Sequence, residues 1–106
     1  MPKYLLQASY TAEGLKGLLK EKAAGRRAAL MSAVEALGGK LDAMYYTLGE
    51  HDGFAIIDLP NIQAATALSV SASASGFVRT STTALLTVDE VDQALSKSVT
   101  YHPPGR

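Results

Sequence analysis

The order of elements along the sequence predicts an α+β domain. Four segments have the alternating or β-branched and aromatic character of strands, and two longer segments carry apolar residues at helical spacing. Together they run in the order β-α-β-β-α-β, and a short helix is expected after the last strand. This order is typical of the ferredoxin-like arrangement, in which one antiparallel sheet has its helices on one face.

The first strand is predicted over residues 3–10, where apolar and polar side chains alternate. Thr11 then occupies the position of a helix N-cap. A long helical region follows, and Gly25 interrupts its pattern, so we expect a break near residues 23–25. Two glycines at 38–39 end the helical region. The first part of this region places three leucines on one side: Leu15, Leu18 and Leu19.

The second half of the chain contains the remaining elements. Asn61 stands at the N-cap of the second helix, which is unusually rich in alanine and serine and therefore allows close approach of a neighbour. The predicted elements are strands over 40–48 and 54–59, a helix over 62–75, a strand over 77–87 and a short helix over 89–98.

Length and composition suit a single domain with a modest core. The chain has 106 residues, of which 47% are hydrophobic. We expect residues 1–99 to form this domain and residues 100–106, which include two prolines, to be an extended tail. A domain of this size buries a limited share of its surface, so pairing with another copy would stabilise it.

Charge balance and missing residue types narrow the expected partners. Ten basic and ten acidic residues leave no basic surplus, so we expect no nucleic-acid partner. Cysteine is absent, and the only histidines, His51 and His102, lie far apart, so we expect no metal. No cofactor is expected, because the glycines do not form a phosphate loop. Since neither a signal peptide nor an apolar segment of about 18 residues is seen, we expect a cytoplasmic protein without a membrane partner.

The predicted sheet has one face that nothing in the chain is left to cover. A small domain does not leave a partly apolar sheet in water without cost. Two copies that pack sheet to sheet would form a dimeric α/β barrel and cover both faces. We therefore expect the protein to be its own partner, as a homodimer or a higher homo-oligomer.

Two stretches of the sequence, ALGGKLDAMYYTLGEHDGFAIIDLPN and SGFVRTSTTALLT, resemble the GYD-domain family. In that family a Gly-x-Tyr-Asp turn joins two strands, and a Gly-x-Val-Arg-Thr segment opens the last strand. Here the turn reads Gly49-Glu50-His51-Asp52, so His51 stands where the family has tyrosine. The resemblance covers about residues 3–95 and implies a ferredoxin-like fold and oligomers, but no general reaction. A looser likeness to dimeric α/β-barrel proteins, among them small monooxygenases and lactone isomerases, concerns the fold alone.

The charged island Glu50-His51-Asp52 has two interpretations. As a hairpin loop, Gly49 and Gly53 supply positive φ, and Asp52 accepts backbone N–H bonds that fix the turn. As a site, His51 is a general base steered by Asp52 or Glu50, because histidine exchanges protons near neutral pH. Adjacent loop side chains tend to diverge, which favours the turn.

The last predicted strand carries the second candidate site. Arg79 and Ser81 fall on one of its faces, and Gln7 and Ser9 of the first strand are placed to line the same face. An arginine among hydroxyls and an amide suits an anionic or carbonyl-bearing ligand. The alternative is that Arg79 forms a salt bridge across a subunit interface.

The two adjacent tyrosines, Tyr45 and Tyr46, are expected on opposite faces of their strand, one in the core and the other in a cavity or an interface. Asp58 lies late in an apolar strand and is expected to face solvent or to pair with Arg79.

Three functions follow from these patterns. The lack of a catalytic set favours a non-enzymatic or accessory oligomer that holds a small ligand between its sheet and a partner. The alternatives are a cofactor-independent isomerase or monooxygenase acting on a small aromatic or lactone, with His51 as the catalytic candidate, and a subunit of a larger ring or shell. The candidate ligand-binding residues are Arg79, Tyr46, Ser81, Gln7 and Asp52.

Overall fold

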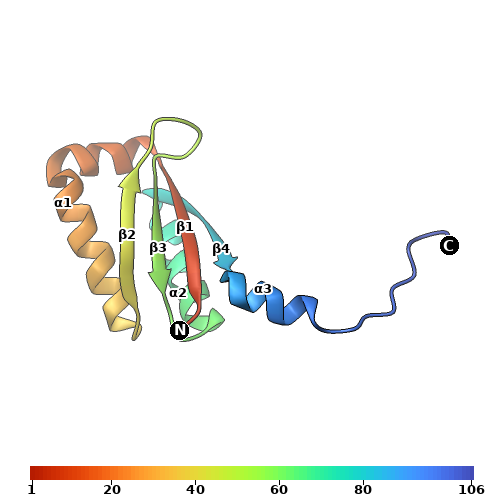
Figure 1. Cartoon of the computed structure of the whole chain (residues 1–106). Helices are drawn as coiled ribbons and strands as arrows, with labels where there is room; N and C mark the ends of the chain where they lie inside the picture. Colours follow the sequence, from red (N-terminus) through yellow and green to blue (C-terminus); the bar gives the residue numbers. More distant parts are fainter.

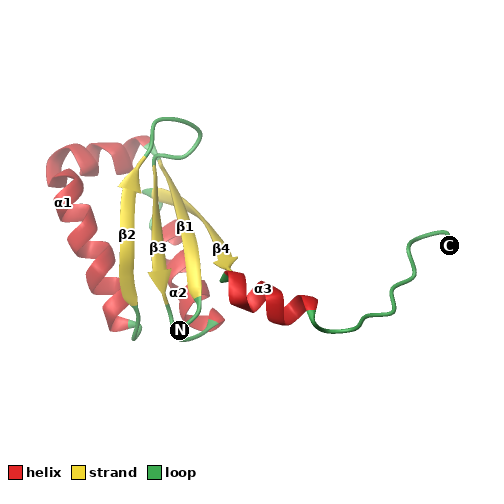
Figure 2. Ribbon diagram, in the orientation of Figure 1, coloured by secondary structure: helices red, strands yellow, loops and turns green.

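The computed structural model describes all 106 residues and confirms an α+β fold with an antiparallel sheet. The four strands lie side by side in the order β2-β3-β1-β4, and every neighbouring pair is antiparallel (Figures 1 and 2). The elements are β1 (Lys3–Tyr10), α1 (Ala12–Ala36), β2 (Lys40–Tyr46), β3 (Gly53–Asp58), α2 (Ile62–Ala74), β4 (Val78–Leu85) and α3 (Val88–Leu95). None of the helices is long and apolar enough to cross a lipid bilayer.

The two longer helices begin where the sequence predicts, whereas α3 ends at Leu95 and not at residue 98. The side chain of Thr11 accepts a hydrogen bond from the backbone N–H of Gly14 at 3.2 Å, and Asn61 does the same for Ala64 at 2.9 Å. Gly38, which follows the C-cap residue Leu37 of α1, has a φ of +83°, a left-handed conformation that glycine adopts without steric cost. These caps satisfy backbone groups that the helix ends would otherwise leave unpaired.

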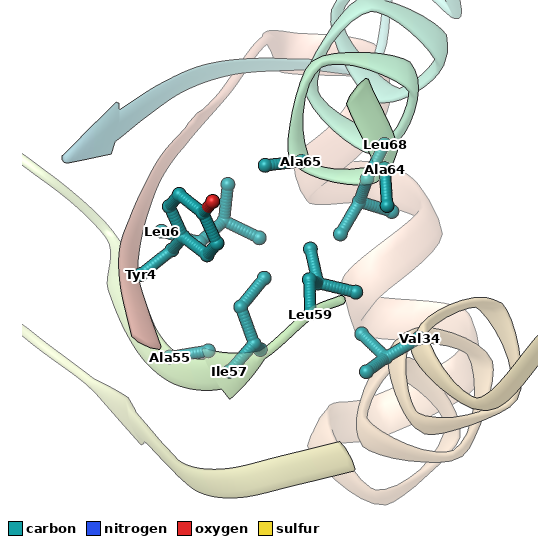
Figure 3. Packing of buried hydrophobic residues seen from close by; sticks show 9 residues of the cluster. All are labelled: Tyr4, Leu6, Val34, Ala55, Ile57, Leu59, Ala64, Ala65 and Leu68. Atoms are coloured by element: carbon teal, nitrogen blue, oxygen red, sulfur yellow. The ribbon is translucent and has the colours of Figure 1, made fainter. Parts of the chain in front are cut away.

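The core lies between one face of the sheet and the helices α1 and α2 (Figure 3). Alternation along β1 and β3 turns every second side chain towards the helices. Val34 is the buried side chain that α1 contributes, and α2 contributes two alanines and a leucine. The nine core residues are Tyr4, Leu6, Val34, Ala55, Ile57, Leu59, Ala64, Ala65 and Leu68.

A sharp bend divides α1 at Lys22, which has φ 69° and ψ 171° (Figure 1). This backbone conformation is almost restricted to glycine and costs about 1–3 kcal/mol for another residue. The bend lies just before the predicted break at residues 23–25, and Gly25 itself stays helical. The first part of α1 leaves Leu15 and Leu19 exposed, Leu19 by 72%, although the sequence groups them as an apolar side.

Helix α3 and the residues after it extend away from the body of the molecule (Figure 1). Thr87 and Glu90 form a capping box, so the start of α3 is fixed locally. Its apolar residues Val88, Val91 and Leu95 are nevertheless all exposed. The radius of gyration of 16.9 Å reflects this extension, because a compact chain of this length has a radius of about 13 Å.

The face of the sheet opposite α1 and α2 has no helix over it, and we call it the open face. Its side chains come from alternate positions of all four strands, as the strand pairings require. One part is apolar, with Leu5, Phe54, Ile56 and Leu85 among its residues, and another part is polar, with Gln7, Ser9, Arg79, Ser81 and Thr83.

Candidate functional site

A polar groove lies on the open face, beside the loop of residues 47–52. Its volume is about 330 Å³, and we call it the open-face groove. It is lined mainly by Gln7, Ser9, Glu50, His51, Arg79 and Ser81. A second hollow of about 220 Å³ shares Gln7, Glu50 and His51 with it, so these three residues stand between the two.

Strand pairing brings four of the lining residues together. In the antiparallel register of β1 and β4, Gln7 lies opposite Ser81, and Ser9 lies opposite Arg79. Residues that face each other in this way project from the same side of a sheet. The structure thus places Gln7, Ser9, Arg79 and Ser81 on one face, as the alternation predicts.

The loop that carries His51 is fixed to β1. The Asp52 carboxylate accepts a hydrogen bond from the backbone N–H of Tyr10 at 2.7 Å, and the Asp52 N–H donates to the Ala8 carbonyl at 2.8 Å. The Thr47 hydroxyl donates to the His51 carbonyl at 2.5 Å and closes the loop from the other side. The loop is therefore positioned by contacts to β1 that a free hairpin turn would lack.

Two details of the predicted turn are wrong. Neither Gly49 nor Gly53 has a positive φ, because the loop is long enough to reverse the chain without a left-handed residue. Asp52 does accept a backbone N–H bond, but the donor is Tyr10 of β1 rather than the turn itself. Asp52 is consequently a positioning residue, and its carboxylate does not line the groove.

His51 contacts a hydroxyl and no carboxylate. Its Nδ1 lies 3.3 Å from the Ser9 Oγ, and that hydroxyl is placed to donate to the Glu50 carbonyl at 3.4 Å. If Ser9 donates to Glu50, its oxygen accepts from Nδ1–H, and Nε2 is left as the free proton acceptor. The prediction that the Asp52 or Glu50 side chain orients His51 is therefore wrong. The Asp52 carboxylate instead accepts from the Tyr10 N–H of β1, and Ser9 is the side chain that contacts the His51 ring.

Arg79 is exposed and forms no ion pair within the chain. The predicted pairing of Arg79 with Asp58 is wrong, because Asp58 lies at the opposite end of the sheet, where its Oδ1 is 2.7 Å from the Lys3 Nζ. Lys3 also contacts Asp42, and the pKa of Lys3 is raised by its hydrogen bond to Asp42 and then by that to Asp58. The guanidinium of Arg79 is thus free to meet an anion.

Tyr46 lies on the helix-bearing face of the sheet, away from the open-face groove. Its hydroxyl is 3.3 Å from that of Tyr10, and burial, followed by this hydrogen bond, raises the pKa of Tyr46 well above its usual 10.0. Tyr45 faces the other way and packs against Phe54, with ring centroids 5.6 Å apart. The opposite-face prediction is confirmed, but neither tyrosine is a core residue, since 61% of Tyr45 and 38% of Tyr46 is exposed.

Of the residues selected from the sequence, the groove contains Gln7, His51, Arg79 and Ser81, and it excludes Tyr46 and Asp52. Its other polar side chains are Ser9, Glu50 and Thr80. Ser9 was predicted on the same face as Arg79, Glu50 was noted in the charged island, and Thr80 was not selected from the sequence. No three side chains of the metal-ligating types gather in one place.

These features define an antiparallel α+β domain with a polar groove on an uncovered sheet face. A family model described as "GYD domain" matches residues 4–95, and the chain belongs to this family. The match confirms the family predicted from the sequence, and its residues include the turn at 49–52, the start of the last strand and α3. No curated protein and no solved structure is significantly similar to the chain.

Proposed function

We propose that the protein is a self-associating, ferredoxin-like domain of the dimeric α/β-barrel type, which binds a small anionic molecule in the open-face groove. The observation that carries this proposal is the uncovered, partly apolar sheet face with Arg79 unpaired beside it. The strand order β2-β3-β1-β4 and the element order β-α-β-β-α-β support the ferredoxin-like assignment.

Packing of two open faces supports the barrel. Phe54 and Ile56 of β3 lie near the middle of the open face and are only half-buried in the single chain. A second copy would remove their apolar surface from water, at roughly 25 cal/mol per Å². The bare apolar side of α3 gives a second reason to expect a partner, because an isolated helix of eight residues is unstable in water.

The chemistry of the groove favours an anion. The Arg79 fork can hold a carboxylate through two parallel N–H bonds, while Ser81 and Gln7 supply further donors from the neighbouring positions. Glu50 is the opposing charge in the lining, so the ligand is expected to be compact and to place its negative group towards Arg79. A facing second copy would roof the groove and exclude water from this contact.

Native mass spectrometry tests both parts of the proposal on one sample. The protein isolated without a denaturing step is expected to appear as an even-numbered oligomer and to retain a small molecule. Benzoate serves as the probe in solution: Arg79→Met is expected to weaken its binding by roughly tenfold or more. Arg27→Met, on α1, is the matched control. Equal benzoate binding by Arg79→Met and the parent protein would refute the ligand site.

A catalytic role is the second candidate, and one contact favours it. Ser9 Oγ lies 3.3 Å from Nδ1 of His51, and in the tautomer in which Nδ1–H donates to Ser9, Nε2 is a proton acceptor at the groove. A cofactor-independent isomerase needs one such group to move a proton between two carbons of a bound carbonyl compound. His51→Gln would abolish turnover in that case and leave benzoate binding largely unchanged, so turnover that survives this substitution would exclude His51 as the base.

A further inference from the structure

Another cavity, similar in volume to the open-face groove, lies on the helix-bearing face of the sheet, inside the bend of α1. Its volume is about 340 Å³, which is within the range of small-molecule sites. Its walls come from both parts of α1, from the end of β1, from the end of α2 and from the residues that open β4. The lining includes Tyr10, Gly17, Glu21, Arg26, Ala72 and Phe77.

The fold holds the two sides of this cavity at a fixed distance. The Thr11 N–H donates to the Phe77 carbonyl at 3.0 Å. Gly14 lets α1 lie directly on this segment, because a Cβ at Gly14 would be 1.9 Å from the Phe77 oxygen. The chain then bends at Lys22, and an ion pair of 3.4 Å between Glu21 and Arg26 spans the bend. The bend brings the Arg26 side chain back to the cavity.

Gly17 is unexplained by the fold itself. It lies inside α1 without a positive φ, and a Cβ placed on it would meet no atom within 4 Å. Glycine is a poor helix former, so neither backbone geometry nor packing accounts for it at this position. Gly17 lines the cavity, and the space at its Cβ position is open, so a side chain there would reduce the free volume. Glycine therefore keeps this space open.

The walls combine an apolar surface with acceptor groups. Phe77 is 54% exposed although it is aromatic, and Tyr10 and Ala72 add apolar surface beside it. Two carboxylates, those of Glu13 and Glu21, line the cavity with one guanidinium, that of Arg26, which pairs with Glu21. Glu13 contacts Lys16, outside the lining, at 3.4 Å. Both ion pairs are solvent-exposed and therefore weak, so the carboxylates stay available to a donor and the lining disfavours an anion. The open-face groove differs from this cavity, because its lining has one acidic residue, Glu50, and one basic residue, Arg79, which is unpaired.

We propose that this cavity binds a single-ring aromatic molecule that is uncharged or cationic and carries a hydrogen-bond donor. The ring covers Phe77 and lies against Tyr10, and the donor reaches the carboxylate of Glu21 or Glu13. The site is on the other side of the sheet from the open-face groove and is independent of the function proposed for that groove.

Tyramine, a phenol with a cationic amine, is the probe, and amide chemical shifts of the labelled protein are the readout. We expect saturable shifts at Gly14, Gly17 and Phe77, and none at Arg79 or Ser81. Benzoate is expected not to shift the cavity residues. If tyramine produces no saturable shift, or shifts only the open-face groove, the proposal is wrong.

Gly17→Leu fills the cavity from α1 and is expected to weaken tyramine binding by roughly tenfold or more. Lys20→Leu adds the same side chain to an exposed position of α1 that does not line the cavity, and it should bind as the parent does. Gly17→Ala should raise the melting temperature by about 2–8 °C, because alanine is the better helix former.

A second cavity-filling variant keeps the test valid if Gly17→Leu does not fold. Ala72→Leu fills the cavity from α2, and Ala74→Leu, which is exposed and outside the lining, is its control. Loss of tyramine binding in Ala72→Leu but not in Ala74→Leu supports the proposal. Unchanged binding in a folded Gly17→Leu or Ala72→Leu overturns it.

Discussion

Asp52 accepts a hydrogen bond from the backbone N–H of Tyr10 at 2.7 Å, and this contact fixes the loop of His51 to the end of β1. The acceptor comes from the loop after β2, and the donor is the last residue of β1. His51 precedes Asp52 and is thereby held beside Ser9 at the open-face groove. A carboxylate that is conspicuous in the sequence thus acts by positioning its neighbour.

Replacing Asp52 by alanine is expected to lower the free energy of unfolding by about 1.5–3 kcal/mol, the usual value of a hydrogen bond to a charged group. Chemical denaturation at neutral pH measures this. Glu50→Ala is the matched control, because the Glu50 carboxylate makes no hydrogen bond in the chain, and its effect should stay within about 0.5 kcal/mol. Equal effects of the two substitutions would show that the Asp52–Tyr10 contact does not hold the loop.

The cluster of Lys3, Asp42 and Asp58 is expected to make stability depend on acid pH. The hydrogen bond from Lys3 lowers the pKa of Asp42 below its usual 3.8. A lowered folded-state pKa stabilises the fold above the unfolded pKa, so this contribution is present at neutral pH and is lost as the pH falls through about 4 and below. Urea midpoints measured from neutral to acid pH should therefore decline less steeply in Lys3→Met than in the parent. Parallel declines would contradict this assignment.

The pair of Tyr46 and Tyr10 predicts a loss of stability at alkaline pH. Burial, followed by the Tyr10 hydrogen bond, raises the pKa of Tyr46 above 10.0. A raised folded-state pKa stabilises the fold below the unfolded pKa, so stability should fall as the pH rises beyond 10. Tyr46→Phe should show a smaller fall than the parent. Tyr101→Phe, in the exposed tail, is the control; a Tyr46→Phe slope equal to that of the control would mean that Tyr46 is not the group responsible.

The strand alternation allowed the faces of the sheet to be predicted, because side chains in a strand project to opposite sides with a period of two. This placed Gln7, Arg79 and Ser81 on one face, and the register of β1 and β4 then brings them together. The caps at Thr11 and Asn61 were also predictable, since they depend on contacts within three residues.

Contacts between distant segments were not predictable in the same way. His51 meets Ser9 across 42 positions. Asp58 pairs with Lys3 and not with Arg79 because the strand registers place Asp58 and Arg79 at opposite ends of the sheet. Both depend on strand order and loop path, which a single sequence does not specify. The bend of α1 lies at Lys22 although Gly25 is the better candidate by propensity, and nothing in the structure explains that choice.

Self-association through the open face predicts a selective effect of a charge on that face. Ile56→Lys places a cation among half-buried apolar side chains of β3 and is expected to dissociate the oligomer with little loss of monomer stability. Val70→Lys, on α2, also replaces a β-branched apolar residue by lysine, at a more exposed position away from the open face. This control substitution should leave the oligomer intact. Dissociation by both substitutions, or by neither, would place the interface elsewhere.

The central claim is that a second copy covers the open face, and sedimentation velocity of the unmodified protein tests it most directly. At micromolar concentration we predict a species of twice the chain mass, or a higher even multiple, with a frictional ratio lower than that of the extended single chain. A single monomeric species across the micromolar range would contradict the claim and leave the open-face groove as an unroofed surface.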